Sequence, residues 1–324
     1  CIRDRQNLVE EAARRAQENS GRDTPSHSID IYRHRRSHIA ATQYRNTTIG
    51  SCSSKNNETA TAQPTKMSCC PPSALPYLAA KPATKGSKKA ADGVEFYETG
   101  AQSKAAIILF PDVWGWDSGR TRALADAFAE QGYRTYVPKV LQPAFEGGTD
   151  GDGLPPTFDL GERGDDFMKW VVTVKWDGID SKVKALLAYA KAEGASSVGV
   201  VGCCWGGWAC FETSAMSADV KVGVIFHPSC HIVAAHGGEV HALAKKVQAP
   251  HYIMPAKSDD PALYGPEGSV IKELPAGSKQ KTFPEQEHGW TSRGDASDPA
   301  VAAAIKDAMT CLLYTSPSPR DRVQ

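Results

Sequence analysis

One stretch constrains the fold of this chain more than any other: residues 198–207, which read VGVVGCCWGG. A short run rich in valine predicts a buried strand, and the glycines that follow predict a sharp turn into a helix. Such a turn leaves no room for side chains two positions before or after its apex, and only Cys204 has glycine at both positions, Gly202 and Gly206. We therefore expect Cys204 to be a nucleophile that projects from the sheet at a helix N-terminus, where the dipole favours a thiolate, and Cys203 to point into the packing.

A structural interpretation of the same stretch stays open. A glycine-rich turn between a strand and a helix can simply hold two small buried cysteines, because free cysteine is usually a core residue. A dinucleotide-binding turn is excluded, since the pattern G-x-G-x-x-G is absent here. The residues that follow in the chain favour the catalytic interpretation.

Alternating strand and helix patterns run through the middle of the chain. Apolar runs and helical periodicity predict strands at 105–110, 134–137, 198–201, 220–226, 250–255 and 280–283, and helices at 118–131, 180–193, 240–247 and 299–309. This order predicts an α/β fold with a mostly parallel central sheet and helices on both faces. Residues 143–164 are rich in Gly, Pro and Asp, so we expect a loop over the site at the carboxyl edge of the sheet.

The two ends of the chain differ in composition from its middle. Residues 1–66 lack apolar periodicity and predict a non-native or disordered leader; a transit peptide fits less well because the stretch contains several acidic residues. We assign residues 67–310 to one domain, truncated at its C-terminus and opened by an extended segment up to about residue 100. Residues 311–324, like the first few of the chain, resemble translated adapter sequence.

The net charge and the cysteine content indicate which partners and which cellular compartment to expect. Lys plus Arg equals Asp plus Glu, 37 each, which gives no electrostatic reason to expect nucleic acid or a membrane surface as partner. Nine cysteines, an odd number without paired C-x-x-C spacing, favour reduced thiols and a cytoplasmic location.

A sharp strand-to-helix turn that carries a nucleophile at its apex is called a nucleophile elbow. Two further residue types complete the pattern expected after such an elbow. Asp259 and Asp260 directly follow the predicted strand 250–255, and His288 follows the strand 280–283. A nucleophile, an acid and a histidine in this order, each behind its own strand, are typical of a hydrolase triad. We choose Asp259 as the acid and keep Asp260 as the alternative.

Several motifs resemble the dienelactone hydrolase family, a cysteine branch of the α/β-hydrolase fold, especially its eukaryotic members. Residues 202–207 (GCCWGG) are similar to the family's elbow, 288–290 (HGW) with 293–295 (RGD) to its histidine loop, and 107–115 to its first strand and turn. The resemblance covers about residues 90–310. It implies a carboxymethylenebutenolidase-like carboxylic ester hydrolase acting on a small ester or lactone.

The resemblance also implies roles for individual residues. Cys204, His288 and Asp259 would form the triad and pass through a thioester intermediate. The backbone amides of Trp205 and Val113 would form the oxyanion hole.

Asp112 and Arg293 would serve in activation of the thiol or in substrate binding. This sequence has Asp112, one methylene shorter, where the family has a glutamate. No cofactor and no metal are expected.

Three other functional interpretations remain. A homologue that lost catalysis could act as a binding protein, and Cys203 with Cys204 could have a thiol-redox role. A group of residues near the middle of the chain could suggest zinc, although its spacing matches no structural zinc pattern: His227, Cys230, His231, His236 and His241.

Overall fold

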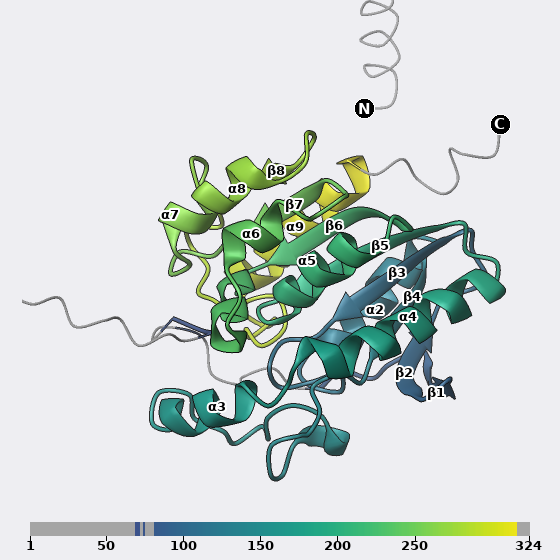
Figure 1. The fold of residues 1–324 in the computed structure, drawn as a ribbon, viewed down its shortest axis with the longest axis horizontal. Coiled ribbons are helices and arrows are strands. Elements are labelled where there is room, and N and C mark those ends of the chain that lie inside the picture. Colours follow the sequence, from purple (N-terminus) through teal and green to yellow (C-terminus); the bar gives the residue numbers. More distant parts are fainter. Residues whose placement is uncertain (1–68, 72–73, 75–80, 316–324) are drawn as a thin grey trace, which may run out of the picture. The chain divides into compact units, whose positions relative to one another are not determined.

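The computed structural model describes residues 69–71, 74 and 81–315 of the chain (Figure 1). Its sheet has eight strands in the order β1-β2-β4-β3-β5-β6-β7-β8. The strands are β1 (Ser87–Ala91), β2 (Val94–Thr99), β3 (Ala105–Phe110), β4 (Arg134–Pro138), β5 (Ser197–Cys203), β6 (Val220–Phe226), β7 (His251–Met254) and β8 (Lys279–Gln280). Strands β4, β3, β5, β6, β7 and β8 run parallel, while β1 and β2 join antiparallel at one edge.

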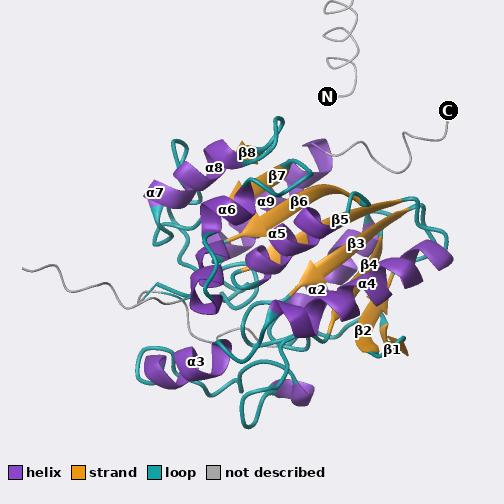
Figure 2. Ribbon diagram, in the orientation of Figure 1, coloured by secondary structure: helices purple, strands orange, loops and turns teal. Residues whose placement is uncertain are grey.

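Helices cover both faces of the sheet (Figure 2). They are α2 (Thr121–Glu130), α3 (Gly164–Val171), α4 (Trp176–Ala192), α5 (Gly206–Met216), α6 (Val240–Ala244), α7 (Pro261–Tyr264), α8 (Ser269–Glu273) and α9 (Pro299–Thr315), with short 3₁₀ turns η1 (Thr149–Gly151) and η2 (Cys230–His236). None of the helices in the described ranges is long and apolar enough to cross a membrane.

Alternate side chains of the central strands pack into two separate hydrophobic cores, one on each face of the sheet. In β5, Val198 and Val200 pack into the core that α4, α5 and α6 cover, whereas Val201 packs into the core that α2 and α9 cover. Every residue of β3 is buried, as expected for a parallel strand with helices on both faces. The predicted α/β architecture is therefore confirmed.

The extended segment predicted before residue 100 is wrong, because β1 and β2 form a hairpin there. Asp92 and Gly93 lie at its turn with φ of 47° and 82°, the pair of positive values that a two-residue hairpin turn requires. Lys88 and Lys89 lie on β1, an exposed edge strand, where charge discourages further strand pairing.

Other element boundaries moved by less. Helix α4 begins at Trp176 rather than residue 180, and β8 is a two-residue strand, with Phe283 reaching Ala256 through an isolated bridge. Helix α9 continues to Thr315, past the domain boundary expected at residue 310. Residues 1–66 lie outside the described residues, and the assignments made for them remain predictions.

Candidate active site

The strand-to-helix turn between β5 and α5 has the strained geometry that the glycine pattern predicts. Cys204 has φ of 55°, a value that residues with a side chain rarely adopt. A methyl group on Gly202 would lie 2.3 Å from the carbonyl oxygen of Gly206, and one on Gly206 would lie 2.4 Å from that of Phe110. The backbone itself therefore excludes any larger residue at these two positions.

The two adjacent cysteines of the turn face different cores. Cys203 packs with the residues that α2 and α9 cover, and its sulfur lies 3.6 Å from the Thr291 hydroxyl. Cys204 packs on the opposite side of the sheet, with its sulfur 3.5 Å from the Ser229 hydroxyl. This separation contradicts the geometry that a redox pair formed by Cys203 and Cys204 would need.

The structure brings His288 and Asp259 together. Nδ1 of His288 lies 2.6 Å from Oδ1 of Asp259, and the other carboxylate oxygen accepts a hydrogen bond from the Ala256 amide. Both side chains are buried. Asp260 is exposed instead, and its carboxylate caps α7 by accepting the Ala262 amide. The geometry thus distinguishes the two aspartates that the sequence left as alternatives.

The surroundings of the two groups favour a thiolate beside an imidazolium. Burial opposes ionisation of His288, but the charges of Asp259 and Cys204 outweigh it and raise the pKa of His288 well above its usual value. Burial likewise opposes ionisation of Cys204, yet a hydrogen bond from Cys69 and the charge of His288 contribute to lowering its pKa. For Cys203, burial has the largest effect and raises the pKa to about 12, although the Thr291 hydrogen bond and the charge of Arg293 oppose it.

Asp112 and Arg293 form a second buried charged pair at the same edge of the sheet. Asp112 accepts hydrogen bonds from the Ser292 hydroxyl at 2.5 Å and the Trp114 amide at 3.0 Å, and Nε of Arg293 lies 3.8 Å from it. Burial raises the pKa of Asp112, while Arg293 acts in the opposite direction. The nitrogens of the Arg293 guanidinium are buried without hydrogen-bond partners, and the group lies 4.1 Å above the Trp114 ring.

Gly289 makes room for that arginine. Its φ is 98°, and a methyl group placed on it would lie 2.3 Å from a guanidinium nitrogen of Arg293. The glycine after the histidine therefore allows the loop to fold back so that His288 and Arg293 enter the same buried space.

The two amides expected to form an oxyanion hole come from neighbouring strands. Val113 follows β3, Trp205 follows β5, and these strands are paired in parallel. Outside regular helices and strands, neither amide donates a hydrogen bond to any described residue.

The loop predicted over the site, residues 143–164, is fixed to the turn after β3. The buried carboxylate of Asp152 accepts the Trp116 amide at 2.8 Å and the Leu141 amide at 2.7 Å. The Leu154 amide donates to the carbonyl of Val113 at 2.9 Å. These contacts hold the loop against the segment that carries Val113.

Sequence reasoning missed several residues that surround Cys204. Cys69 and Cys70, more than 130 residues away in the chain, place their sulfurs 3.6 Å and 3.5 Å from the Cys204 sulfur. Ser229 donates a hydrogen bond to the carbonyl of Cys69. No local pattern signals such a return of the chain, although the repeated Cys-Cys pair was visible.

His227 was considered only as a zinc ligand, but it packs against the candidate base. Its ring centroid lies 4.8 Å from that of His288, and its Nε2 lies 2.6 Å from the Thr291 hydroxyl. Burial and the charge of His288 hold the pKa of His227 well below its usual value, so its ring stays neutral. The other members of that group do not converge with it on a ligand set among the described residues.

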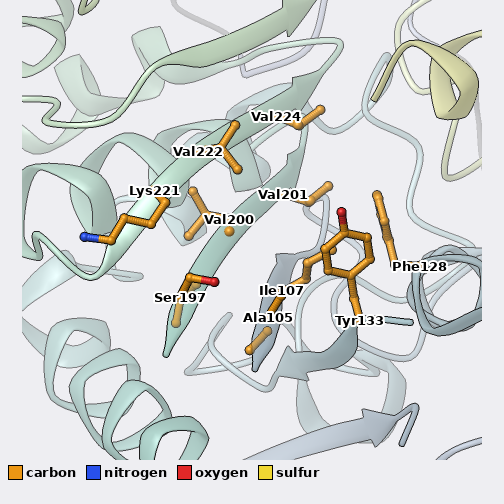
Figure 3. Close-up of a pocket in the computed structure, with 13 residues that line it drawn as sticks. Ala105, Ile107, Phe128, Tyr133, Ser197, Val200, Val201, Lys221, Val222 and Val224 are labelled. Atoms are coloured by element: carbon orange, nitrogen blue, oxygen red, sulfur yellow. The ribbon is translucent and has the colours of Figure 1, made fainter. Parts of the chain in front are cut away.

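An apolar hollow lies at the opposite, amino end of the strands (Figure 3). Residues at the starts of β3, β5 and β6 line it together with Phe128 and Tyr133. None of the residues assigned above to the candidate site lines this hollow. We therefore place the chemistry at the carboxyl end of the sheet, where ligands of open α/β sheets bind.

Comparison with known proteins finds relatives of this chain. Over 214 residues the chain is 27% identical to a carboxymethylenebutenolidase homolog of Rattus norvegicus, covering 64% of this chain and 80% of that one. The Homo sapiens homolog is 31% identical over 120 residues, 37% of this chain and 44% of that one, so the match spans less than half of the human relative.

A solved structure shares the fold, and a family model matches most of the domain. The crystal structure of a putative dienelactone hydrolase from Klebsiella pneumoniae has a TM-score of 0.52 at 16% identity, and covers 72% of this chain and 98% of that one. The model of the dienelactone hydrolase family matches residues 92–315. This chain belongs to the dienelactone hydrolase family.

Proposed function

We propose that the protein hydrolyses a small ester or lactone, with Cys204 as nucleophile, His288 as acid and base, and Asp259 as the group that orients the histidine. One observation carries the proposal. The strained elbow holds the Cys204 thiol at the start of α5, where a hydrogen bond from Cys69 and the charge of the Asp259-bound His288 lower its pKa against the effect of burial.

The first half of the reaction forms a thioester. The Cys204 thiolate attacks the substrate carbonyl carbon, and the carbonyl oxygen becomes an anion that the amides of Val113 and Trp205 stabilise. The carbon–oxygen bond of the ester then breaks, and protonated His288 donates its proton to the departing alkoxide. In a lactone the released hydroxyl stays attached to the acyl group.

The second half needs one water molecule. Neutral His288 takes a proton from this water, whose oxygen attacks the thioester carbonyl. The carbon–sulfur bond breaks, Cys204 leaves as thiolate, and the carboxylic acid is released. Asp259 holds the ring by its Nδ1 in both halves, so Nε2 always faces the reacting atoms.

Arg293 and Asp112 support a substrate that carries a carboxylate. Asp112 lies 3.8 Å from the buried guanidinium, yet the guanidinium nitrogens make no hydrogen bond of good geometry, and a substrate carboxylate would match these planar donors. The Asp112 carboxylate already accepts hydrogen bonds from the Ser292 hydroxyl and the Trp114 amide. We therefore propose that Asp112, which is shorter than the family's glutamate, positions Arg293 rather than contacting the thiol.

A thiol-redox role remains the second candidate, although not through Cys203. The contact of Cys70 with Cys204 at 3.5 Å between sulfurs is the observation that favours it. Under this alternative, peroxide would modify the cysteines while esters would not react.

The absence of disulfides among the described cysteines supports the proposed cytoplasmic location.

A steady-state screen tests the proposal. Wild-type protein, Cys204→Ser and Cys203→Ser are assayed with small aryl esters and unsaturated lactones in the presence of a reductant and a chelator. We expect turnover by wild type and Cys203→Ser, and a loss of about 10²-fold or more in Cys204→Ser, because serine lacks the low pKa of the thiol. Equal activity of all three proteins would contradict the assignment.

A further inference from the structure

Three cysteines from two distant parts of the chain meet at one point. The sulfurs of Cys69 and Cys70 lie 3.6 Å and 3.5 Å from that of Cys204, and the three ligand atoms all lie within 4.8 Å of one another. All three side chains are buried, with at most 4% of their surface exposed. The hydrolytic mechanism uses one of these thiols and gives no function to the other two.

The spacing of the sulfurs fits a shared metal ion. Zinc–thiolate bonds of about 2.3 Å at tetrahedral angles separate neighbouring sulfurs by about 3.8 Å. The observed contacts are only a few tenths of an ångström shorter than this. A disulfide would instead require the sulfurs to approach to about 2.05 Å.

His288 offers a candidate fourth ligand atom beside the three sulfurs. Its buried Nε2 has no hydrogen-bond partner of good geometry, while Nδ1 is bound to Asp259. Histidines that ligate metals characteristically donate the other ring nitrogen's proton to a carboxylate, as His288 does here. The charge of His288 and a hydrogen bond with it help to lower the pKa of Cys70, so the imidazole neighbours this thiol as well.

The segment that carries the additional thiols is held in place by its backbone. The Ser229 hydroxyl donates to the carbonyl of Cys69, and its oxygen lies 3.5 Å from the Cys204 sulfur. One serine therefore touches both parts of the cluster and fixes the two neighbouring cysteines beside the elbow.

We propose that Cys69, Cys70, Cys204 and His288 bind one thiophilic divalent ion, and that this ion is Zn²⁺. Its binding inhibits the hydrolase. Soft thiolates with one imidazole in a tetrahedral arrangement select zinc among the common divalent ions. Each thiol that binds releases its proton to solvent. The ion occupies both the nucleophile and the base, so ester hydrolysis requires that it leave.

Cobalt substitution tests the site independently of catalysis. Full-length reduced protein is titrated with Co²⁺, whose thiolate charge-transfer absorption and intense visible bands report tetrahedral sulfur ligation. We expect saturation at one ion per chain and displacement by Zn²⁺. Cys69→Ser and Cys70→Ser should bind at least about tenfold more weakly, since even second-shell partners of metal ligands contribute that much affinity.

Cys210→Ser is the matched control, because Cys210 is a buried cysteine on α5 outside the cluster. It should retain the wild-type spectrum and affinity. Native mass spectrometry of each variant verifies that the metal is bound to folded protein. Zn²⁺ should inhibit ester turnover by wild type and by Cys210→Ser, and should no longer inhibit Cys70→Ser at the same concentration.

Three results would overturn the proposal: no sulfur-to-cobalt absorption, equal binding by the variants and wild type, or a disulfide from Cys204 to Cys69 or Cys70 in place of metal binding. A protein that binds cobalt in this way and hydrolyses no ester would instead contradict the proposed function. The two proposals are therefore separable.

Discussion

Cys203 and Cys204 are neighbours in the chain and both are fully buried, yet they pack on opposite sides of the sheet and their pKa values shift in opposite directions. The Cys203 sulfur has the Thr291 hydroxyl as its polar contact, and burial raises the pKa of Cys203 to about 12. The side of Cys204 holds His288 and further thiols, and its pKa falls. Backbone geometry at one turn thus separates the two thiols, and our proposal gives Cys203 a packing role and Cys204 the chemistry.

Removing each thiol should give the largest contrast between the two sides. We expect Cys204→Ala to abolish ester turnover, because no nucleophile remains at the elbow, while Cys203→Ala keeps most of it. The measurement is kcat/KM with an aryl ester, with circular dichroism to verify folding. Comparable losses in both variants would show that the elbow as a whole, rather than one thiol, is required.

The next effect concerns the two aspartates on the Cys204 side. Asp259→Asn should lower kcat by about 10²- to 10⁴-fold, since the amide favours the wrong imidazole tautomer. Asp260→Asn changes an exposed helix cap and should cost no more than about 1 kcal/mol of stability. Rate measurements and urea unfolding check the pair, and a reversed order would move the acid to Asp260.

The pH dependence of alkylation should change in a defined direction. In wild type, the iodoacetamide reaction of Cys204 should have its midpoint below the ordinary thiol value of about 8.5. Asp259→Asn removes the negative charge that keeps His288 protonated, so the pKa of His288 falls and that of Cys204 rises. The midpoint should therefore move to higher pH.

Peptide-level mass spectrometry reads Cys204 and Cys203 in the same samples, so Cys203 is the internal control. It should remain unmodified throughout the accessible range. An unchanged midpoint in Asp259→Asn would mean that the carboxylate does not control the thiol.

The smallest expected effect comes from replacing two glycines with alanine. The comparison separates the cost of a steric clash from the cost of backbone strain. Gly289 and Gly132 both have positive φ, of 98° and 91°, but a methyl group on Gly132 meets nothing within 4 Å. Both alanine variants should lose about 1–2 kcal/mol of stability from the backbone strain. Gly289→Ala should also raise KM for carboxylate-bearing esters, because the methyl group displaces Arg293. An equal KM in both variants would remove Arg293 from substrate binding.

Local rules recovered the elements and residues that lie at strand ends. Cys204, Asp259 and His288 each follow a strand, and parallel strands bring their carboxyl ends to one edge, so order along the chain was enough to group them. The Asp92–Gly93 hairpin was also readable, but the lysines beside it masked the signal.

Contacts between segments that lie far apart in the sequence could not be predicted. Whether Cys69 and Cys70 approach Cys204 depends on where a segment far away in the sequence packs, and no periodicity encodes that. The same holds for Ser229, whose hydroxyl links the two parts. That the carboxylate of Asp112 is held by Ser292 likewise emerged from tertiary packing.

Mapping the covalent intermediate tests the central claim most directly. Wild-type protein is acid-quenched during turnover of a slowly hydrolysed aryl ester, and peptides are sequenced by mass spectrometry at low pH to preserve the thioester. The account predicts one acyl group, on Cys204. An acyl group on Cys203 would invalidate the elbow geometry as the source of reactivity. An acyl group on Cys70 would transfer the role of nucleophile to another thiol whose pKa His288 lowers.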